Sequence, residues 1–458
     1  MKKDFILKEI FRQNRHWENP DEFFFDIEHI EYQRTLYFSL VPALKKRQII
    51  SLVGLRRVGK TVLLKQLIKN LLSNVDAEAI LFLSFDEVLF PKDVTLADYI
   101  DAYLEHKAPK DTRLTIFLDE IQYAKQWHHI LKRYYDTEPN IKFIISGSSS
   151  LFLQKKTTET LAGRIEEFFL PVLSFEEYLS LKRVSTILVD AYQGGAVTIG
   201  DSAAHALRHE RITAQYGNDL IAHFDDFLRF GQFPELIGTE ETGAKQKYLE
   251  ESIFKKTVEY DIPRIFGVEK VDELKFLFAV ILSETGLLSE PTNLAREIGI
   301  DAATVKKYLS YFEQSFLVYP LHNYSKSFRK SRRLLKKLYL GSSNFLSLFT
   351  DWRDSEISRQ RTGFMVENYV FSLLRRQFRF CSFYRVRSHE FDFLCSNDMR
   401  DTRAFQHIEV KWREHIDMRD IPFLTRVAKK HNAPMTVISR MSHALSSDIT
   451  VIPAWLLK

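Results

Sequence analysis

The chain has 458 residues, 45% of them hydrophobic, which is enough to build about three domains. It carries 65 Lys and Arg against 60 Asp and Glu, so the net charge of +5 leaves any nucleic-acid binding to local basic patches. Two cysteines, Cys381 and Cys395, are too few for a disulfide framework or a cysteine-based zinc site. We interpret them as core or near-surface thiols in a reducing cytosol.

The first segment, MKKDFILKEIFRQ, has a basic tip, but Lys8 and Glu9 interrupt its apolar residues. A signal peptide would have an unbroken apolar stretch at this point. No apolar run in the chain approaches the ~20 residues that a membrane-spanning helix needs. We therefore expect a cytoplasmic protein without membrane contact, which begins with a helical extension over residues 1–35.

The clearest motif follows a short apolar run over residues 49–53. GLRRVGKT, from Gly54 to Thr61, matches GxxxxGK[ST], and apolar residues at helical spacing come after it. The two glycines allow the backbone to turn successive N–H groups toward phosphate oxygens at a helix N-terminus. Lys60 is expected to reach the β- and γ-phosphates, and Thr61 to ligate Mg²⁺. The predicted nucleotide-binding residues of this loop are Gly54, Leu55, Arg56, Arg57, Val58, Gly59, Lys60, Thr61 and Val62.

Two further apolar runs and a glycine-rich turn carry polar candidates. RLTIFLDEIQ contains Asp119, which would support Mg²⁺ through water, and Glu120, which would polarise the attacking water. NIKFIISGSSS makes Ser146 or Ser148 a candidate sensor of the γ-phosphate, although a plain strand-to-loop turn explains these serines equally well. Arg164 in LAGR is a candidate for stabilising charge on the transferred phosphoryl group. The alternative for Arg164 is a surface arginine in a loop.

A helix-turn-helix pattern lies in TNLAREIGIDAATVKKYLSYF. Gly299 makes the turn, and Asp301 caps the second helix. Lys306 and Lys307 would face outward, as residues of a helix that enters a major groove do. FLVYPL then predicts the strand of a wing. Winged helices also mediate protein contacts, so a protein partner stays an alternative to DNA.

A basic segment, KSFRKSRRLLKK over residues 326–337, follows the predicted wing. Its cationic side chains can neutralise several phosphates, which favours DNA as a partner of this region. The alternative is a solvated basic loop.

The C-terminal part carries acidic residues inside apolar patterns. GFMVENYVFSLL predicts a helix with Glu367 near its start, and SFYRVRSHEFDFL and AFQHIEVKW predict two strands. Helix, strand with Asp and strand with ExK is the order of restriction-endonuclease-like nucleases. Asp392 and Glu409 would ligate Mg²⁺ with Glu367 as an added ligand, and Lys411 would orient or deprotonate the attacking water. The alternative is a fold of this type that is retained for binding only.

The succession of motifs resembles the AAA-type ATPases of bacteria and archaea that carry a C-terminal domain of unknown function. The resemblance rests on the loop above and on FLDEIQ, FIISGSSS, LAGR, LPVLSFEEYL, FLRFGQFPELI, VEYDIPRIFGV and GFMVENYVFSLL, and it covers nearly the whole chain. It implies a helical lid over the nucleotide. Two places depart from the family: Gly231 and Gln232 stand where it usually has two glycines before FPE, and Ser342 and Asn344 replace Asp and Gly in its KxYFxDxGL motif.

These interpretations together predict an α/β protein with a P-loop NTPase parallel sheet, a helical lid, a winged helix-turn-helix and a C-terminal α/β restriction-endonuclease-like domain. The expected boundaries are an N-terminal helical extension at 1–35, a P-loop ATPase core at 36–183, an insertion and helical lid at 184–265, a winged helix-turn-helix at 266–335 and the nuclease-like domain at 336–458. We interpret residues 184–224 as an insertion or flexible connection.

The expected function is hydrolysis of ATP with Mg²⁺, coupled to a DNA- or protein-binding winged helix and a nuclease-like domain. The alternative is an ATP-switched module that binds nucleic acid or protein, with little hydrolysis and no nuclease activity. If Arg164 acts in trans, the protein forms a homo-oligomer.

Overall fold

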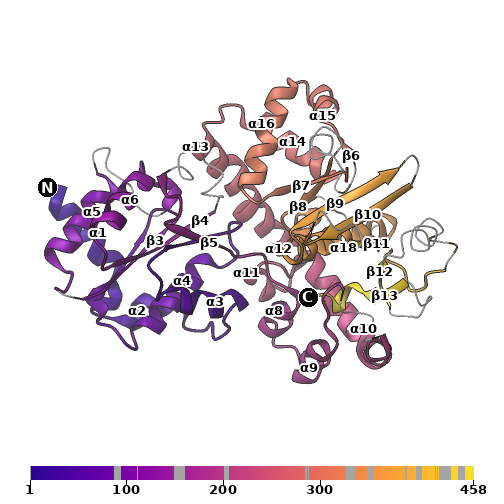
Figure 1. Cartoon of the computed structure of the whole chain (residues 1–458), viewed down its shortest axis with the longest axis horizontal. Helices are drawn as coiled ribbons and strands as arrows, with labels where there is room; N and C mark the ends of the chain where they lie inside the picture. Colours follow the sequence, from indigo (N-terminus) through magenta and orange to yellow (C-terminus); the bar gives the residue numbers. More distant parts are fainter. Residues whose placement is uncertain are drawn as a thin grey trace. The chain divides into compact units, whose positions relative to one another are not determined.

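The chain folds into two compact units, Met1–Pro171 with Gln314–Phe316, and Val172–Glu313 with Leu317–Lys458, called unit 1 and unit 2 below (Figure 1). The computed structural model describes residues 2–86, 94–110, 112–148, 160–200, 206–283, 286, 288–325, 336–348, 350, 355–386, 389–398, 405–417, 419, 421, 435–441 and 449–458. The break between the units falls after Pro171, and the expected end of the ATPase core at residue 183 stays a prediction. Of the helices described, none combines the length and apolar character needed to cross a membrane.

Unit 1 is built on a parallel five-stranded sheet, part of which is labelled in Figure 1. The strand order is β2-β3-β4-β1-β5. Its strands are β1 (Ile49–Val53), β2 (Ile80–Ser84), β3 (Leu114–Asp119), β4 (Ile141–Gly147) and β5 (Ile165–Phe169), and its longer helices are α1 (Lys2–Gln13), α3 (Thr35–Ala43), α4 (Lys60–Leu71), α5 (Leu96–His106) and α6 (Trp127–Thr137). Every residue of β1 to β4 is buried, as expected of parallel strands with helices on both faces. This sheet confirms the predicted α/β class for unit 1.

The N-terminal segment completes the edge of this sheet. β2 is an edge strand, and the Asn14 side chain both donates to the Phe82 carbonyl (2.9 Å) and accepts from the Phe82 N–H (2.7 Å). Gln13 accepts from the Ser84 N–H at 2.6 Å in the same way. Two side-chain amides thus satisfy backbone groups that a further strand would otherwise pair. Residues 1–35 thus belong to unit 1, and the predicted boundary at residue 35 stays a prediction.

Unit 2 begins with helices. They are α8 (Phe175–Leu181), α9 (Thr186–Gly195), α10 (Ala206–Phe230), α11 (Pro234–Ile237), α12 (Thr242–Tyr248), the π-helix η6 (Leu249–Asp261), α13 (Ile262–Phe266) and α14 (Val271–Ser283). Residues 184–224 are mostly helical where they are described, and their interpretation as an insertion or flexible connection stays a prediction. α9 and α10 cover most of that range, and Val197 pairs with the end of the chain by donating to the Leu456 carbonyl at 2.8 Å.

A small antiparallel sheet, β6-β8-β7, follows α14. It consists of β6 (Leu288–Ser289), β7 (Val318–His322) and β8 (Lys336–Leu340), and α15 (Pro291–Ile298) and α16 (Ala302–Gln314) lie between its first two strands in the chain. Gly299 ends α15 with φ +79°, and Asp301 accepts from the N–H groups of Ala303 and Thr304 at the start of α16. The turn and cap residues thus have the local geometry that their sequence indicates.

The C-terminal part contains a mixed sheet with the order β13-β12-β11-β10-β9 and a long helix. The elements are η7 (Ser343–Ser347), α18 (Ser355–Gln377), β9 (Phe380–Val386), β10 (His389–Ser396), β11 (Gln406–Val410), β12 (Met435–Ser439), β13 (Ile449–Pro453) and η10 (Ala454–Leu456). β9, β10 and β11 are antiparallel neighbours, and β12 and β13 continue the sheet in parallel. The β9–β10 register shifts between Phe391 and Leu394.

The two departures from the family motifs lie against each other. The Gln232 side chain accepts hydrogen bonds from the Ser342 hydroxyl (2.6 Å) and the Ser343 N–H (2.9 Å), and the backbone N–H of Gln232 donates to the Asn344 side chain (2.9 Å). Asn344 in turn donates to the carbonyls of Phe227 and Leu228 near the end of α10. All of these polar groups are buried, so the substitutions at the two motifs compensate each other.

We predict that Gln232→Ala and Asn344→Ala each lower the free energy of unfolding by about 1–3 kcal/mol, because each leaves buried donors or acceptors without a partner. The double variant should lose less than the sum, since one network is removed twice. Urea unfolding of the single and double variants measures this coupling. Gln193→Ala, which removes an exposed bond to Glu176, is the matched control and should change stability by less than about 0.5 kcal/mol. Strict additivity of the two variants would contradict the proposed network.

Candidate nucleotide-binding site

The loop between β1 and α4 has the backbone geometry of an anion-binding turn. Gly59 (φ +96°) and Arg57 (φ +67°) are left-handed, and Gly59 immediately precedes the first turn of α4. A Cβ atom on Gly54 would overlap the carbonyl oxygen of Leu170, so the strand that neighbours β1 leaves room only for glycine. The N–H groups at this helix N-terminus favour bound negative charge.

Lys60 is buried, with only 4% of its surface exposed. Its ammonium donates to the carbonyls of Gly54 (3.1 Å) and Leu55 (3.0 Å) and lies 3.6 Å from a Glu120 carboxylate oxygen. The rest of the loop surrounds it: Leu55 and Val58 are buried, Val62 is half-buried, Arg57 is exposed and Arg56 pairs with Asp86 at 3.2 Å.

The loop and the acidic pair are in direct contact. The Thr61 hydroxyl donates to Asp119 at 2.7 Å. Ser146, at the end of the neighbouring strand β4, also donates to Asp119 and accepts from the Glu120 N–H at 3.1 Å. The predicted ligand Thr61, the predicted metal-shell residue Asp119 and the predicted sensor Ser146 therefore occupy one edge of the sheet.

Glu120 adopts a left-handed conformation (φ +51°), which is uncommon for a residue other than glycine. Its carboxylate accepts from the Gln122 side chain and from the Ser148 N–H (3.2 Å), and Gln122 also donates to the Ser148 hydroxyl (3.1 Å). The surrounding structure over-determines this conformation, a property that is frequent at active sites.

The two carboxyl groups have different protonation preferences. Burial, together with the neighbouring Glu120 charge, raises the pKa of Asp119 to about 6. Burial also disfavours the charge of Glu120, but the Lys60 ammonium and the Gln122 hydrogen bond outweigh it and hold the pKa of Glu120 below its ordinary value. Of the two carboxyl groups, Glu120, next to Lys60, therefore holds its negative charge to lower pH than Asp119 does.

Two residues that the sequence analysis did not single out also belong to the site. Gln122 orients the Glu120 carboxylate. The only feature of the sequence that points to Gln122 is its position two residues after the acidic pair. Arg34 is buried and donates to the carbonyls of Val58 and Pro171, both at 2.8 Å. No motif surrounds Arg34, and only the tertiary structure places it against the loop.

Arg164 does not reach this site within one chain. It lies at the start of β5, where its carbonyl accepts from the Ile49 N–H, and β1 runs from Ile49 away from it to the loop. Five residues at about 3.3 Å each give a separation of roughly 16 Å. The Arg164 side chain instead pairs with Asp136 (2.8 and 3.2 Å). Arg164 therefore lies away from the loop of its own chain, and a role in trans at the phosphoryl group of another subunit stays a prediction.

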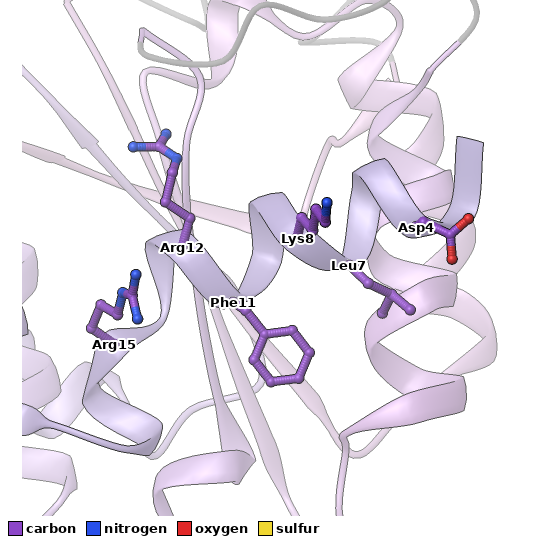
Figure 2. Close-up of a pocket in the computed structure, with 6 residues that line it drawn as sticks. All are labelled: Asp4, Leu7, Lys8, Phe11, Arg12 and Arg15. Carbon is purple, nitrogen blue, oxygen red and sulfur yellow. The ribbon is translucent and has the colours of Figure 1, made fainter. Parts of the chain in front are cut away.

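A separate hollow of about 410 Å³ runs along α1 (Figure 2). Leu7 and Phe11 line it together with Lys8, Arg12 and Arg15, and Asp4 lies at one end. α1 packs against β2, at the far edge of the sheet from β1, so this hollow is not the nucleotide site. Arg12 also pairs with Glu9 at 2.7 Å, which neutralises part of its charge.

The C-terminal carboxylates form a second cluster, in unit 2. The Lys411 ammonium lies 2.6 Å from Glu409, the Asp392 N–H donates to Glu409 at 3.4 Å, and Asp392 accepts from the Val410 N–H at 2.9 Å. Glu367 accepts from the Tyr339 hydroxyl at 2.6 Å. Burial and the Asp392 charge raise the pKa values of Glu367 and Glu409 to about 7. The structure thus brings the predicted residues together.

Lys337 supplies the positive charge at the centre of this cluster. Its side chain is 6% exposed, and its ammonium lies 2.6 Å from Glu390, 3.5 Å from Glu367 and 3.8 Å from Asp392. The prediction that Lys337 is part of a surface basic cluster is therefore wrong; residues 326–335 of that segment lie outside the described residues.

The carboxylate oxygens of the predicted Mg²⁺ site already have partners in the structure. Within the described part of the chain, no three His, Cys, Asp or Glu residues are arranged to hold a metal ion. Tyr339, Lys337 and Lys411 already engage the carboxylate oxygens. The assignment of Glu367, Asp392 and Glu409 as metal ligands stays a prediction.

Comparisons with known proteins agree with the site in unit 1. Residues 46–179 match a family model described as an AAA domain, and residues 221–356 match one described as a domain of unknown function. An uncharacterized protein of Methanocaldococcus jannaschii is 25% identical over 360 residues, 75% of this chain and 69% of that protein. An uncharacterized protein of Haemophilus influenzae is 24% identical over 298 residues, 64% of this chain and 66% of that protein. A second M. jannaschii relative, 27% identical over 297 residues, is covered over 60% of its length.

Among solved structures, the Aeropyrum pernix ORC1 protein in complex with DNA has a TM-score of 0.30 and 13% identity, over 71% of this chain and 92% of that one. So low a TM-score supports no statement about this protein. The match to the AAA domain, in contrast, contains the whole loop and the acidic pair that the structure joins. Residues 46–179 are therefore similar to an AAA domain over the whole segment that contains the loop and the acidic pair.

Proposed function

We propose that unit 1 hydrolyses ATP in a Mg²⁺-dependent reaction. The observation that carries this proposal is the 2.7 Å hydrogen bond between the Thr61 hydroxyl and Asp119. Both groups present the hard oxygen atoms that Mg²⁺ prefers, and they lie beside a loop suited to phosphate. Bound Mg²⁺ would neutralise the charge that develops on the β- and γ-phosphate oxygens.

Lys60 and Glu120 have complementary roles in this proposal. In the structure, the Lys60 ammonium contacts two loop carbonyls and Glu120. A γ-phosphate would replace these partners, which moves Lys60 onto the nucleotide and releases Glu120 to accept a hydrogen bond from the attacking water. Gln122 and Ser148 keep the Glu120 carboxylate oriented meanwhile.

We predict that Lys60→Ala lowers ATP turnover by at least ~100-fold, because it removes charge stabilisation from the transferred phosphoryl group. Glu120→Gln should keep nucleotide binding and lower turnover by about 10²–10⁴-fold, the usual contribution of a general base. Phosphate release and nucleotide titration calorimetry measure the two effects separately. Lys69→Ala, an exposed lysine of the same helix, is the matched control and should behave as wild type. Unchanged turnover in Lys60→Ala would refute the proposal.

The second candidate for unit 1 is a switch that binds ATP with little hydrolysis. Phosphate release distinguishes the two candidates. A switch would bind nucleotide but release little phosphate, with or without duplex DNA. The oriented Glu120 carboxylate favours hydrolysis over the switch.

We further propose that residues 271–322 and 336–340 form a winged helix that binds DNA. The order of α14, β6, α15, α16, β7 and β8, and the strand order β6-β8-β7, support this fold. Lys306 and Lys307 are exposed on α16, where they are available to phosphates.

The double variant Lys306→Glu/Lys307→Glu should weaken duplex DNA binding and lower the slope of log K against log salt by about two, since two phosphate contacts are lost. Fluorescence anisotropy at several salt concentrations provides the slope. Lys247→Glu/Lys256→Glu changes the net charge equally at two other exposed lysines of unit 2 and serves as control. If both double variants bind alike, the surface of α16 is not the DNA site, and a protein partner is favoured.

For the C-terminal sheet we propose a nuclease-like domain that is retained for binding and does not cleave. Its support is Lys337, whose ammonium stands among the carboxylates that cleavage would require as metal ligands. An internal cation stabilises such a buried cluster without a metal.

Lys337→Met should destabilise the protein strongly, by about 3–5 kcal/mol, because it leaves buried carboxylates without their cation. Mn²⁺ should raise the melting temperature of this variant more than that of wild type, since a divalent ion can replace the ammonium. Incubation of DNA and RNA with Mg²⁺ or Mn²⁺ tests cleavage independently of that variant's folding. Cutting by wild type that Asp392→Asn abolishes would overturn the proposal.

A further inference from the structure

The only two cysteines of the chain face each other across neighbouring strands. Cys381 lies on β9 and Cys395 on β10, and the two are direct partners in the antiparallel ladder. Their Sγ atoms are 2.9 Å apart, in hydrogen-bond contact. Fourteen positions separate them in sequence, so the strand register alone brings the two thiols together.

This arrangement suits a disulfide bond. Directly opposed residues of an antiparallel pair have Cα atoms about 4.5–5.5 Å apart, and disulfides span Cα separations of about 4.4–6.8 Å. The backbone therefore needs little movement to form the bond. Disulfides of this kind in reducing surroundings are usually transient.

The two thiols differ in access. Cys395 is buried and Cys381 is half-buried, so an external reagent meets Cys381 first. Burial, together with the neighbouring Cys381, raises the pKa of Cys395, which keeps it a protonated thiol until its partner reacts. Cys381 is thus the thiol that reacts first with an external disulfide, and Cys395 is placed to attack the mixed disulfide that forms on Cys381.

The position of the pair also connects it to the carboxylate cluster. Cys395 lies three residues after Asp392 on β10, and the β9–β10 register shift falls between Phe391 and Leu394. Leu394, Cys395 and Ser396 form the regular end of the ladder beyond this shift. A bond between the two strands there would clamp the segment that holds Asp392 against Val410.

We propose that Cys381 and Cys395 form a thiol–disulfide exchange site whose substrate is a low-molecular-weight disulfide such as oxidised glutathione. The Cys381 thiolate attacks one sulfur of the small disulfide, the S–S bond breaks, and one glutathione leaves as a thiolate. Cys395 gives up its proton and attacks Cys381 Sγ, and the second glutathione leaves. Two electrons pass from the protein thiols to the small disulfide, and the two protons released end on the glutathione thiols.

The experiment uses the full chain, oxidised glutathione in excess, an alkylating quench and intact-protein mass spectrometry. Wild type is expected to lose two hydrogens and to have no alkylatable thiol, without gaining glutathione. Cys395→Ser should stop at a mixed disulfide and gain the mass of one glutathione, because the resolving thiol is missing. Cys381→Ser should stay unmodified in the folded state, because Cys395 is buried.

Two results overturn the proposal: wild type that keeps both thiols, and wild type that accumulates a stable glutathione adduct. Thermal unfolding of both serine variants, followed by circular dichroism, reports whether unit 2, which contains both cysteines, is folded. Cleavage of the new bond by reduced glutathione, with return of both thiols, completes the exchange cycle.

Discussion

The nucleotide site depends on the order of the parallel strands in unit 1. β4 lies between β1 and β3, and the carboxyl ends of all three meet at one edge of the sheet. The loop after β1, the acidic pair at the end of β3 and Ser146 at the end of β4 therefore meet without any long side chain having to span the sheet. Reversal of one strand would place these groups about 16 Å apart, as the position of Arg164 at the opposite end of β5 illustrates.

Buried ammonium groups organise a site in each unit, but their surroundings differ. Lys60 contacts two loop carbonyls and Glu120 beside N–H groups that favour an anion, so a phosphate can take over its partners. Lys337 instead lies among Glu367, Glu390 and Asp392, and a cation that approached this cluster would have to displace it. The buried Lys60 ammonium is thus available to an anionic ligand, whereas the buried Lys337 ammonium already balances the charge of the carboxylates around it.

The departures from the family motifs at Gln232 and Asn344 are explained only when the two are considered together. Gln232 alone, in place of a glycine, would bury an amide, and Asn344 alone would do the same. In the structure the Gln232 side chain accepts from the Ser343 N–H, and the Asn344 side chain accepts from the Gln232 backbone N–H. Asn344 also donates to two carbonyls near the end of α10. A sequence pattern records the two changes separately, more than a hundred residues apart, and gives no sign that they touch.

Contiguous residues encode the features that could be predicted directly: the phosphate loop from Gly54 to Thr61, the acidic pair at the end of β3, and the turn and cap at Gly299 and Asp301. Local backbone torsions and hydrogen bonds suffice for these, so short patterns predict them. Only the tertiary structure placed Arg34 on the loop, moved Arg164 away from it, completed the β2 edge with Asn14 and set Lys337 among the carboxylates. Each of these is a contact between distant segments, and its partner is fixed by strand order and packing, which hydrophobic periodicity along one segment does not specify.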